Sequence, residues 1–167
     1  MCSHRVLACA LMSALLVGRA SAQTPGIYGF LDIKTRFAVR LAVEGAAARL
    51  ARPNCQEIFA DFEDEFGQRL STKLATSGKR PLDAFGELRF LDDRGARQCL
   101  RSGIVAFTEI GSSSIRVCAK RFRLAFQWNR RATEVAVIHE FLHALGLGEN
   151  PPSSRAITER VRVRCGD

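Results

Sequence analysis

The sequence predicts a single α+β domain behind a short N-terminal segment, and three observations support this. Apolar residues recur with helical spacing from Leu31 to about Ala51 and again from Thr133 to Leu147. Two β-rich stretches, Gly103–Ile110 and Ser114–Phe122, flank the turn Gly111-Ser112-Ser113, which is typical of a hairpin. The chain has 167 residues, 47% hydrophobic and 25% charged, which suits one globular domain and excludes a disordered or coiled-coil chain.

We expect residues 1–22 to form a secretory signal peptide. Arg5 precedes the apolar stretch Val6–Gly18, and Ala20-Ser21-Ala22 is a small-x-small cleavage pattern. The apolar stretch is shorter than the roughly 20 residues that a membrane-spanning helix needs. The sequence therefore predicts an exported protein, periplasmic or secreted, whose mature domain of residues 23–167 begins at Gln23 and has no transmembrane segment.

The first half of the domain is expected to alternate between helix and strand. After a lead-in over residues 23–30, the helix from Leu31 ends before Pro53. Alternation of Ile58, Ala60 and Phe62 predicts a half-buried strand over Gln56–Phe62. Further along, we expect a short helix or strand at Leu70–Thr76, a helical turn at Leu82–Phe85 and a strand at Glu87–Leu91.

The second half contains the hairpin and two helices. Thr133 or a neighbour is expected to cap the helix that runs to Leu147, and Gly146 or Gly148 to end it. Asn150-Pro151-Pro152 then forces an extended turn, and Ser153 or Ser154 caps a last helix that reaches about Arg164. We expect a short mixed or antiparallel sheet packed on the Thr133–Leu147 helix.

The cysteines point to two disulfides. Loss of the signal peptide removes Cys2 and Cys9, and an even number of cysteines in an exported chain indicates a disulfide framework. Four cysteines allow three pairings, and the sequence does not select one. We favour Cys99–Cys118, which brackets the hairpin, and Cys55–Cys165, which ties the C-terminal tail to the body; no C-x-x-C spacing suggests a cysteine zinc site. The four candidates are Cys55, Cys99, Cys118 and Cys165.

The two histidines that remain in the mature domain form an H-E-x-x-H motif. His139 and His143 are four residues apart in a helical pattern, so their imidazoles lie on one helix face and can converge on a metal ion. Glu140 cannot easily share that metal but can reach a water bound to it. The spacing therefore predicts two Zn²⁺ ligands and one general base.

A third zinc ligand must come from another residue type. Glu149 completes H-E-x-x-H-x-x-G-x-x-E, which resembles the metzincin motif H-E-x-x-H-x-x-G-x-x-H. That resemblance implies a small zincin-like domain with Glu149 as third ligand, although the only methionines, Met1 and Met12, leave no Met-turn. The alternative ligand is Glu159 on the following helix, as in the gluzincin arrangement. The run His139–Ser154 is also similar to short exported bacterial proteins described as candidate metallopeptidases.

We therefore expect an exported zinc-dependent hydrolase, with a peptidase as the leading activity and Glu140 as its base. A peptide or protein substrate would lie along an edge strand from the Gly103–Phe122 hairpin, as the zincin arrangement implies. The alternative is a disulfide-stapled exported binding or inhibitory protein with a structural or non-catalytic metal site.

Basic residues are common, and the formal net charge of the full chain is +8. They gather in a stretch before the motif and in the last helix. We expect solvated basic faces with a weak attraction for anionic surfaces, and no nucleic-acid site. These residues are Lys120, Arg121, Arg123, Arg130, Arg131, Arg155, Arg160, Arg162 and Arg164.

Overall fold

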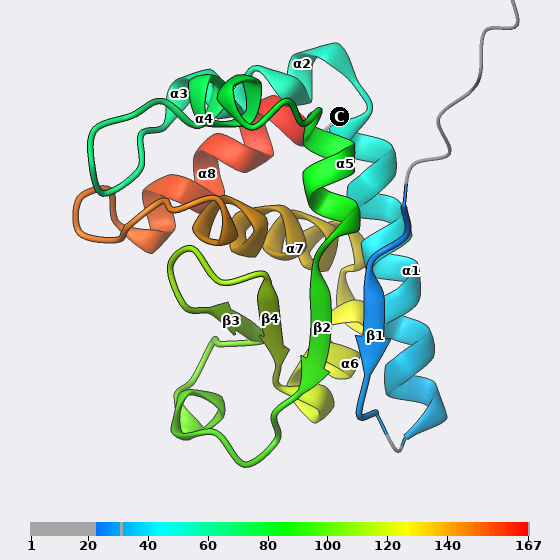
Figure 1. Ribbon diagram of the computed structural model, residues 1–167. Helices are drawn as coiled ribbons and strands as arrows, with labels where there is room; N and C mark the ends of the chain where they lie inside the picture. The colour runs from blue at the N-terminus through cyan, green and yellow to red at the C-terminus, as the bar shows by residue number, and fades with distance from the viewer. Residues whose placement is uncertain (1–22, 31, 167) are drawn as a thin grey trace, which may run out of the picture.

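The fold is α+β, as predicted, and the sheet is mixed (Figure 1). The structure is a computed structural model that describes residues 23–30 and 32–166, so the expected signal peptide lies outside the described residues. The sheet has the order β1-β2-β4-β3, in which β3 is antiparallel to β4 and the other pairs are parallel. Its strands are β1 (Gly26–Tyr28), β2 (Arg89–Asp92), β3 (Ala106–Thr108) and β4 (Ser114–Val117).

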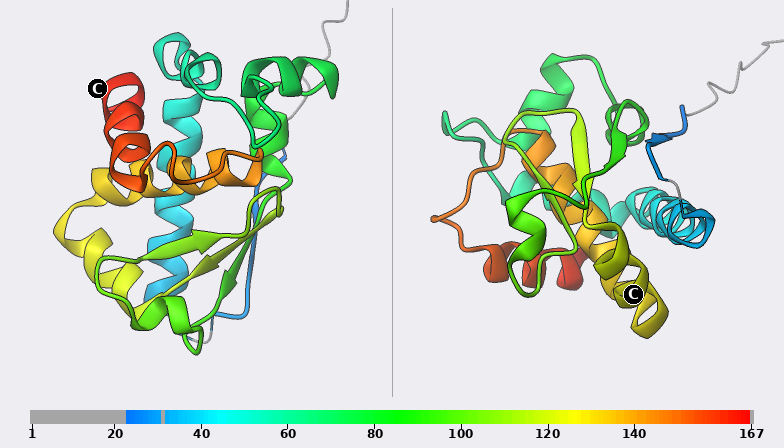
Figure 2. Two further views of the ribbon diagram at one scale, coloured as in Figure 1. Left: turned by 90° about the vertical axis from the view of Figure 1, so that its left-hand side faces the viewer. Right: turned by 90° about the horizontal axis from the view of Figure 1, so that it is seen from below.

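Three helices pack against the sheet and against one another: α1 (Ile33–Leu50), α6 (Ala119–Trp128) and α7 (Arg130–Ala144). Figure 2 shows α1 and α6 behind the sheet, with α7 crossing above the strands. Phe90 on β2 pairs in register with Ile115 on β4, and both side chains are fully buried in the core. The Asp32 side chain accepts hydrogen bonds from the first backbone N–H groups of α1, which fixes where that helix begins.

The predicted strand over Gln56–Phe62 is wrong, because this segment forms short helices. Cys55, Ile58 and Phe59 are buried while Ala60 is exposed, which is the i, i+3, i+4 pattern of a helix against a core. Pro53 occupies the first helical position, where its missing N–H costs nothing. The connecting helices are α2 (Pro53–Gln56), α3 (Ile58–Asp61), α4 (Leu70–Thr76) and α5 (Pro81–Gly86), with a 3₁₀ turn at Arg97–Leu100.

Other boundaries also differ from the predictions. The hairpin is present, but its second strand ends at Val117 and Phe122 lies buried in α6. The lead-in contains β1, and Asn129 rather than Thr133 caps α7. The last helix, α8 (Ser154–Cys165), begins after a Ser153 cap as predicted.

Both favoured disulfide pairings are confirmed, Cys55–Cys165 and Cys99–Cys118. Two disulfides suit an oxidising environment. Within residues 23–30 and 32–166, no helix is both long enough and apolar enough to cross a membrane.

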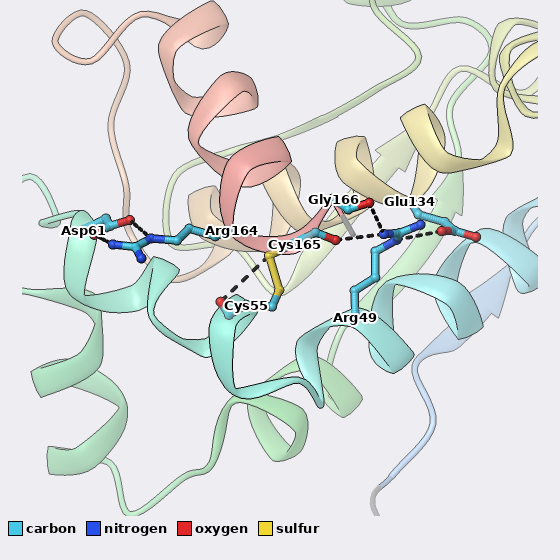
Figure 3. Close-up of a disulfide and its surroundings, with 7 residues drawn as sticks. All are labelled: Arg49, Cys55, Asp61, Glu134, Arg164, Cys165 and Gly166. Carbon is cyan, nitrogen blue, oxygen red and sulfur yellow. Dashed lines mark hydrogen bonds and ion pairs between the residues drawn. A yellow bond between two sulfur atoms is a disulfide. The ribbon is translucent and has the colours of Figure 1, made fainter.

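The end of α8 is fixed to the rest of the domain by contacts that we call the C-terminal clamp: Arg49, Cys55, Asp61, Arg164 and Cys165 (Figure 3). The Cys55–Cys165 disulfide joins α2 to α8. From α1, the Arg49 guanidinium donates to the carbonyl oxygens of Cys165 and Gly166 at 2.8 and 3.0 Å and to Glu134 on α7 at 2.8 Å. Arg164 forms two hydrogen bonds to Asp61 and thereby lowers the pKa of that carboxyl. Arg164 is thus a structural residue rather than part of a solvated basic face.

We expect Arg49→Met to lower the free energy of unfolding by about 2–3 kcal/mol, because it leaves two carbonyl oxygens unpaired and removes a cation from a buried carboxylate. Urea denaturation of the oxidised protein measures this effect. Arg40→Met is the matched control, since Arg40 is exposed and forms a surface pair with Glu44 at 3.7 Å. Equal midpoints for the two variants would show that the Arg49 contacts contribute little.

Candidate metal centre

The C-terminal half of α7 and the turn after it position the motif residues. His139 and His143 lie one turn apart on α7 and are almost completely buried. Gly146 follows with a φ of 108°, a conformation that glycine adopts without strain. The chain turns here and returns Glu149 to the two imidazoles.

Three potential ligand atoms converge in the space beside α7. The Nε2 atoms of His139 and His143 are 3.0 Å apart, and a carboxylate oxygen of Glu149 lies 3.6 and 3.4 Å from them, respectively. A tetrahedral zinc ion with bonds of about 2.1 Å holds its ligand atoms about 3.4 Å apart. The side chains therefore fit such an ion, and they form a possible metal-binding group among the described residues.

Glu159, the alternative third ligand, lies elsewhere. Its side chain is exposed on α8 and its carboxylate is 3.5 Å from Arg162. It does not belong to the group of three that could hold a metal in the described part of the chain. The geometry favours Glu149, and the identity of the third ligand stays a prediction.

Hydrogen bonds to the other ring nitrogens orient both imidazoles. His143 Nδ1 is 2.7 Å from the carbonyl oxygen of Leu147, which can only accept, so Nδ1 carries the proton and Nε2 presents a lone pair. His139 Nδ1 is 2.9 Å from the Thr158 hydroxyl on α8. Metal-binding histidines typically donate their second N–H in this way, so the pattern supports metal ligation through both Nε2 atoms.

Burial favours the neutral imidazole that metal binding requires. Burial lowers the pKa of His139 to about 4, and the neighbouring His143 contributes further to the lowering. At neutral pH, His139 therefore has a free lone pair available for a cation. Only 5% of His139 is exposed, so little water can solvate that lone pair.

Glu140 lies next to His139, His143 and Glu149, on the side that faces β3, the edge strand of the sheet. Burial raises the pKa of its carboxyl to about 8, whereas the Thr108 hydroxyl on β3 lowers it and the Glu149 charge raises it. Within the described residues, the buried Thr108 hydroxyl has no hydrogen-bond partner of regular geometry. A cation at the neighbouring site would favour the ionised carboxylate, the form that can accept a proton from water.

Two residues of this site are absent from the sequence prediction. Thr158 lies 19 positions from His139, and the contact depends on how α8 crosses α7, which no local spacing encodes. Thr108 comes near Glu140 only because β3 packs against α7. Their identification required the tertiary structure.

Thr158→Val should lower zinc affinity by about 10–100-fold, the usual cost of removing a hydrogen-bond partner of a metal-binding histidine. The valine keeps the shape of threonine but cannot accept the Nδ1–H. Competition with a chromophoric chelator measures the affinity, and Thr158→Ser, which retains the hydroxyl, should bind zinc nearly as well as the wild type. Equal affinity for the valine variant and the wild type would show that this contact does not support the ligand.

Comparisons with protein-family models, with curated proteins and with solved structures find no match to this chain. The resemblance to zincins therefore rests on the motif residues from His139 to Glu149.

Proposed function

We propose that this chain is an exported zinc-dependent hydrolase of zincin type that cleaves peptide bonds. The observation that carries the proposal is the convergence of the His139, His143 and Glu149 ligand atoms beside a buried carboxyl group, Glu140. Three protein ligands leave a fourth tetrahedral position free, which is the composition of a catalytic rather than a closed structural zinc site.

The chemistry follows from the positions of these side chains. Bound zinc would supply a water of lowered pKa and polarise the scissile carbonyl. Glu140 accepts a proton from the water and passes it to the leaving amine. Thr158 and the Leu147 carbonyl hold the two imidazoles in the orientation that presents Nε2.

Strand β3 is suited to align a peptide. It is the last strand of the sheet, pairs only with β4 among the described strands, and packs against α7 near Glu140. Its free edge can accept an extended peptide by strand addition, which would place a backbone carbonyl near the metal. This supports a peptide or protein substrate over a small metabolite.

Metal removal tests the proposal. The full chain is produced by export from a bacterial host, its N-terminus is determined by mass spectrometry, and its zinc content is measured. We expect one zinc per chain, cleavage of an unfolded protein or a peptide library, and loss of cleavage after chelation. Zinc restoration should recover cleavage and raise the unfolding free energy by about 4 kcal/mol at a thousandfold excess over the dissociation constant.

The alternative is a disulfide-stapled exported binding or inhibitory protein whose metal site is not catalytic. Equimolar zinc without cleavage of either substrate would favour this alternative. A protein that binds no zinc would contradict the metal site itself, and with it both functions.

A further inference from the structure

A ridge of exposed apolar side chains on α1 is separate from the metal centre and has no role in the proposed hydrolysis. Ile33 and Phe37 form this α1 ridge, and they are 68% and 52% exposed. The two residues are four positions apart on one helix face, and contiguous exposed apolar side chains, unlike scattered ones, commonly mark an interaction surface. The left view of Figure 2 shows the N-terminal end of α1 near α6 at the lower end of the molecule, whereas the C-terminal end of α1 lies near α8.

Hollows of about 400 Å³ lie on both sides of the ridge. The one toward β1 is lined by Ile27, Arg36 and Arg40 in addition to the ridge. The one toward α6 is lined, beside the ridge, by Lys34, Ala38, Arg123, Phe126 and Gln127. The ridge therefore protrudes between two depressions, with cationic side chains on either side.

Arginines also stack on the aromatic rings of both helices. The Arg40 guanidinium lies 5.3 Å from the ring centroid of Phe37, and the Arg130 guanidinium lies 5.9 Å from that of Phe126. A ring with a guanidinium above it can enter the headgroup layer of a bilayer while the cation contacts a lipid phosphate. Trp128, a residue type that prefers such interfaces, ends α6 and is 91% exposed.

The charge around the ridge is positive after its acidic partners are counted. Asp32 lies 3.5 Å from Arg123, Glu44 lies 3.7 Å from Arg40, and Glu134 pairs with Arg130. Lys34 and Arg36 have no ion pair in the part of the chain that the structure describes. A symmetric dimer through this ridge would bring these cations near their own copies, which disfavours a second chain as the occupant.

We propose that the α1 ridge docks this protein on an anionic phospholipid bilayer. Ile33 and Phe37 enter the headgroup region, and the surrounding Lys and Arg side chains contact lipid phosphates. This inference does not depend on the metal centre, because α1 supplies none of the proposed ligands.

Vesicle binding tests the proposal with the protein as it is recovered after export. Vesicles contain either phosphatidylcholine alone or equal parts of phosphatidylcholine and phosphatidylglycerol. We expect sedimentation with the mixed vesicles only, release at high salt, and a blue shift in the emission of Trp128, the one tryptophan in the chain. No binding to the mixed vesicles would overturn the proposal.

Paired variants separate the contribution of the apolar side chains to vesicle binding from that of the cationic side chains. The double substitution Ile33→Ser and Phe37→Ser should weaken vesicle binding about tenfold, and Lys34→Gln with Arg36→Gln should do the same. Phe66→Ser is the matched control, because Phe66 is 92% exposed between α3 and α4, and it should bind as the wild type does. Thermal melting verifies the fold, and the Lys34/Arg36 variant still tests the proposal if the ridge variant does not fold.

Two further results would overturn the proposal. Wild-type vesicle binding by a folded ridge variant would show that charge alone attracts the protein. A dimer in sedimentation analysis that the ridge substitutions dissociate would assign the ridge to a second copy of the chain.

Discussion

Glu140→Gln should reduce hydrolysis by about 10²–10⁴-fold while zinc remains bound. The amide has nearly the shape of the carboxyl group but cannot accept a proton from water. Glu140 is 9% exposed and is not one of the three ligand residues, so the substitution removes the base without removing a zinc contact. Steady-state cleavage of a peptide substrate and zinc content, measured on the same preparations, test this result.

The control for this variant is Glu44→Gln. It makes the same chemical change on an exposed side chain of α1, where the loss of a surface pair with Arg40 should leave activity unchanged. A Glu140→Gln variant that retains zinc and full activity would exclude Glu140 as the base. Loss of zinc from that variant would instead show that Glu140 is needed for zinc binding.

Glu149→Ala should lower zinc affinity by more than about 100-fold, whereas Glu159→Ala should leave it unchanged. Removal of a direct ligand should cost more than removal of a hydrogen-bond partner of a ligand. The Glu149 carboxylate lies 3.4 Å from His143 Nε2, and the Glu159 carboxylate lies beside Arg162 instead. The pair of variants thus compares two glutamates that the sequence alone treats as alternatives.

Chelator competition and cobalt substitution measure the outcome. The visible spectrum of bound Co²⁺ reports the coordination of the metal, so Glu149→Ala should change it and Glu159→Ala should not. Glu149→His supplies a nitrogen in place of the carboxylate and should recover part of the affinity. If Glu159→Ala releases the metal while Glu149→Ala retains it, the assignment of the third ligand is wrong.

The elements predicted well are those whose signals are local. The helix that carries His139 and His143, the hairpin of β3 and β4, and the Ser153 cap of α8 follow from periodicity, turn residues and capping. The favoured disulfides also follow from position, since Cys99 and Cys118 bracket the hairpin. For the site, the motif spacing indicates the side chains that converge in the structure.

The elements predicted poorly depend on tertiary packing. The segment with Ile58, Ala60 and Phe62 alternates in sequence, yet burial of Phe59 with Ile58 makes it helical. Strand β1 has three residues and exists because it pairs with β2. Thr158 contacts His139 because the C-terminal clamp fixes α8 across α7. These contacts cannot be predicted from residues that are neighbours in the sequence.

The C-terminal clamp also bears on when, during synthesis of the chain, the site around His139 can form. Helix α8 consists of 12 residues at the end of the chain, and its Thr158 orients His139 on a helix that is synthesised earlier. Arg49 and Cys55, which fix α8 in place, belong to the first half of the chain. They cannot form these contacts until Cys165 has been synthesised. A nascent chain would therefore contain the three proposed ligands, His139, His143 and Glu149, before α8 is present to orient His139. We therefore expect the proposed metal centre to be loaded late in biogenesis, after α8 has been synthesised and joined to α2 by the Cys55–Cys165 disulfide.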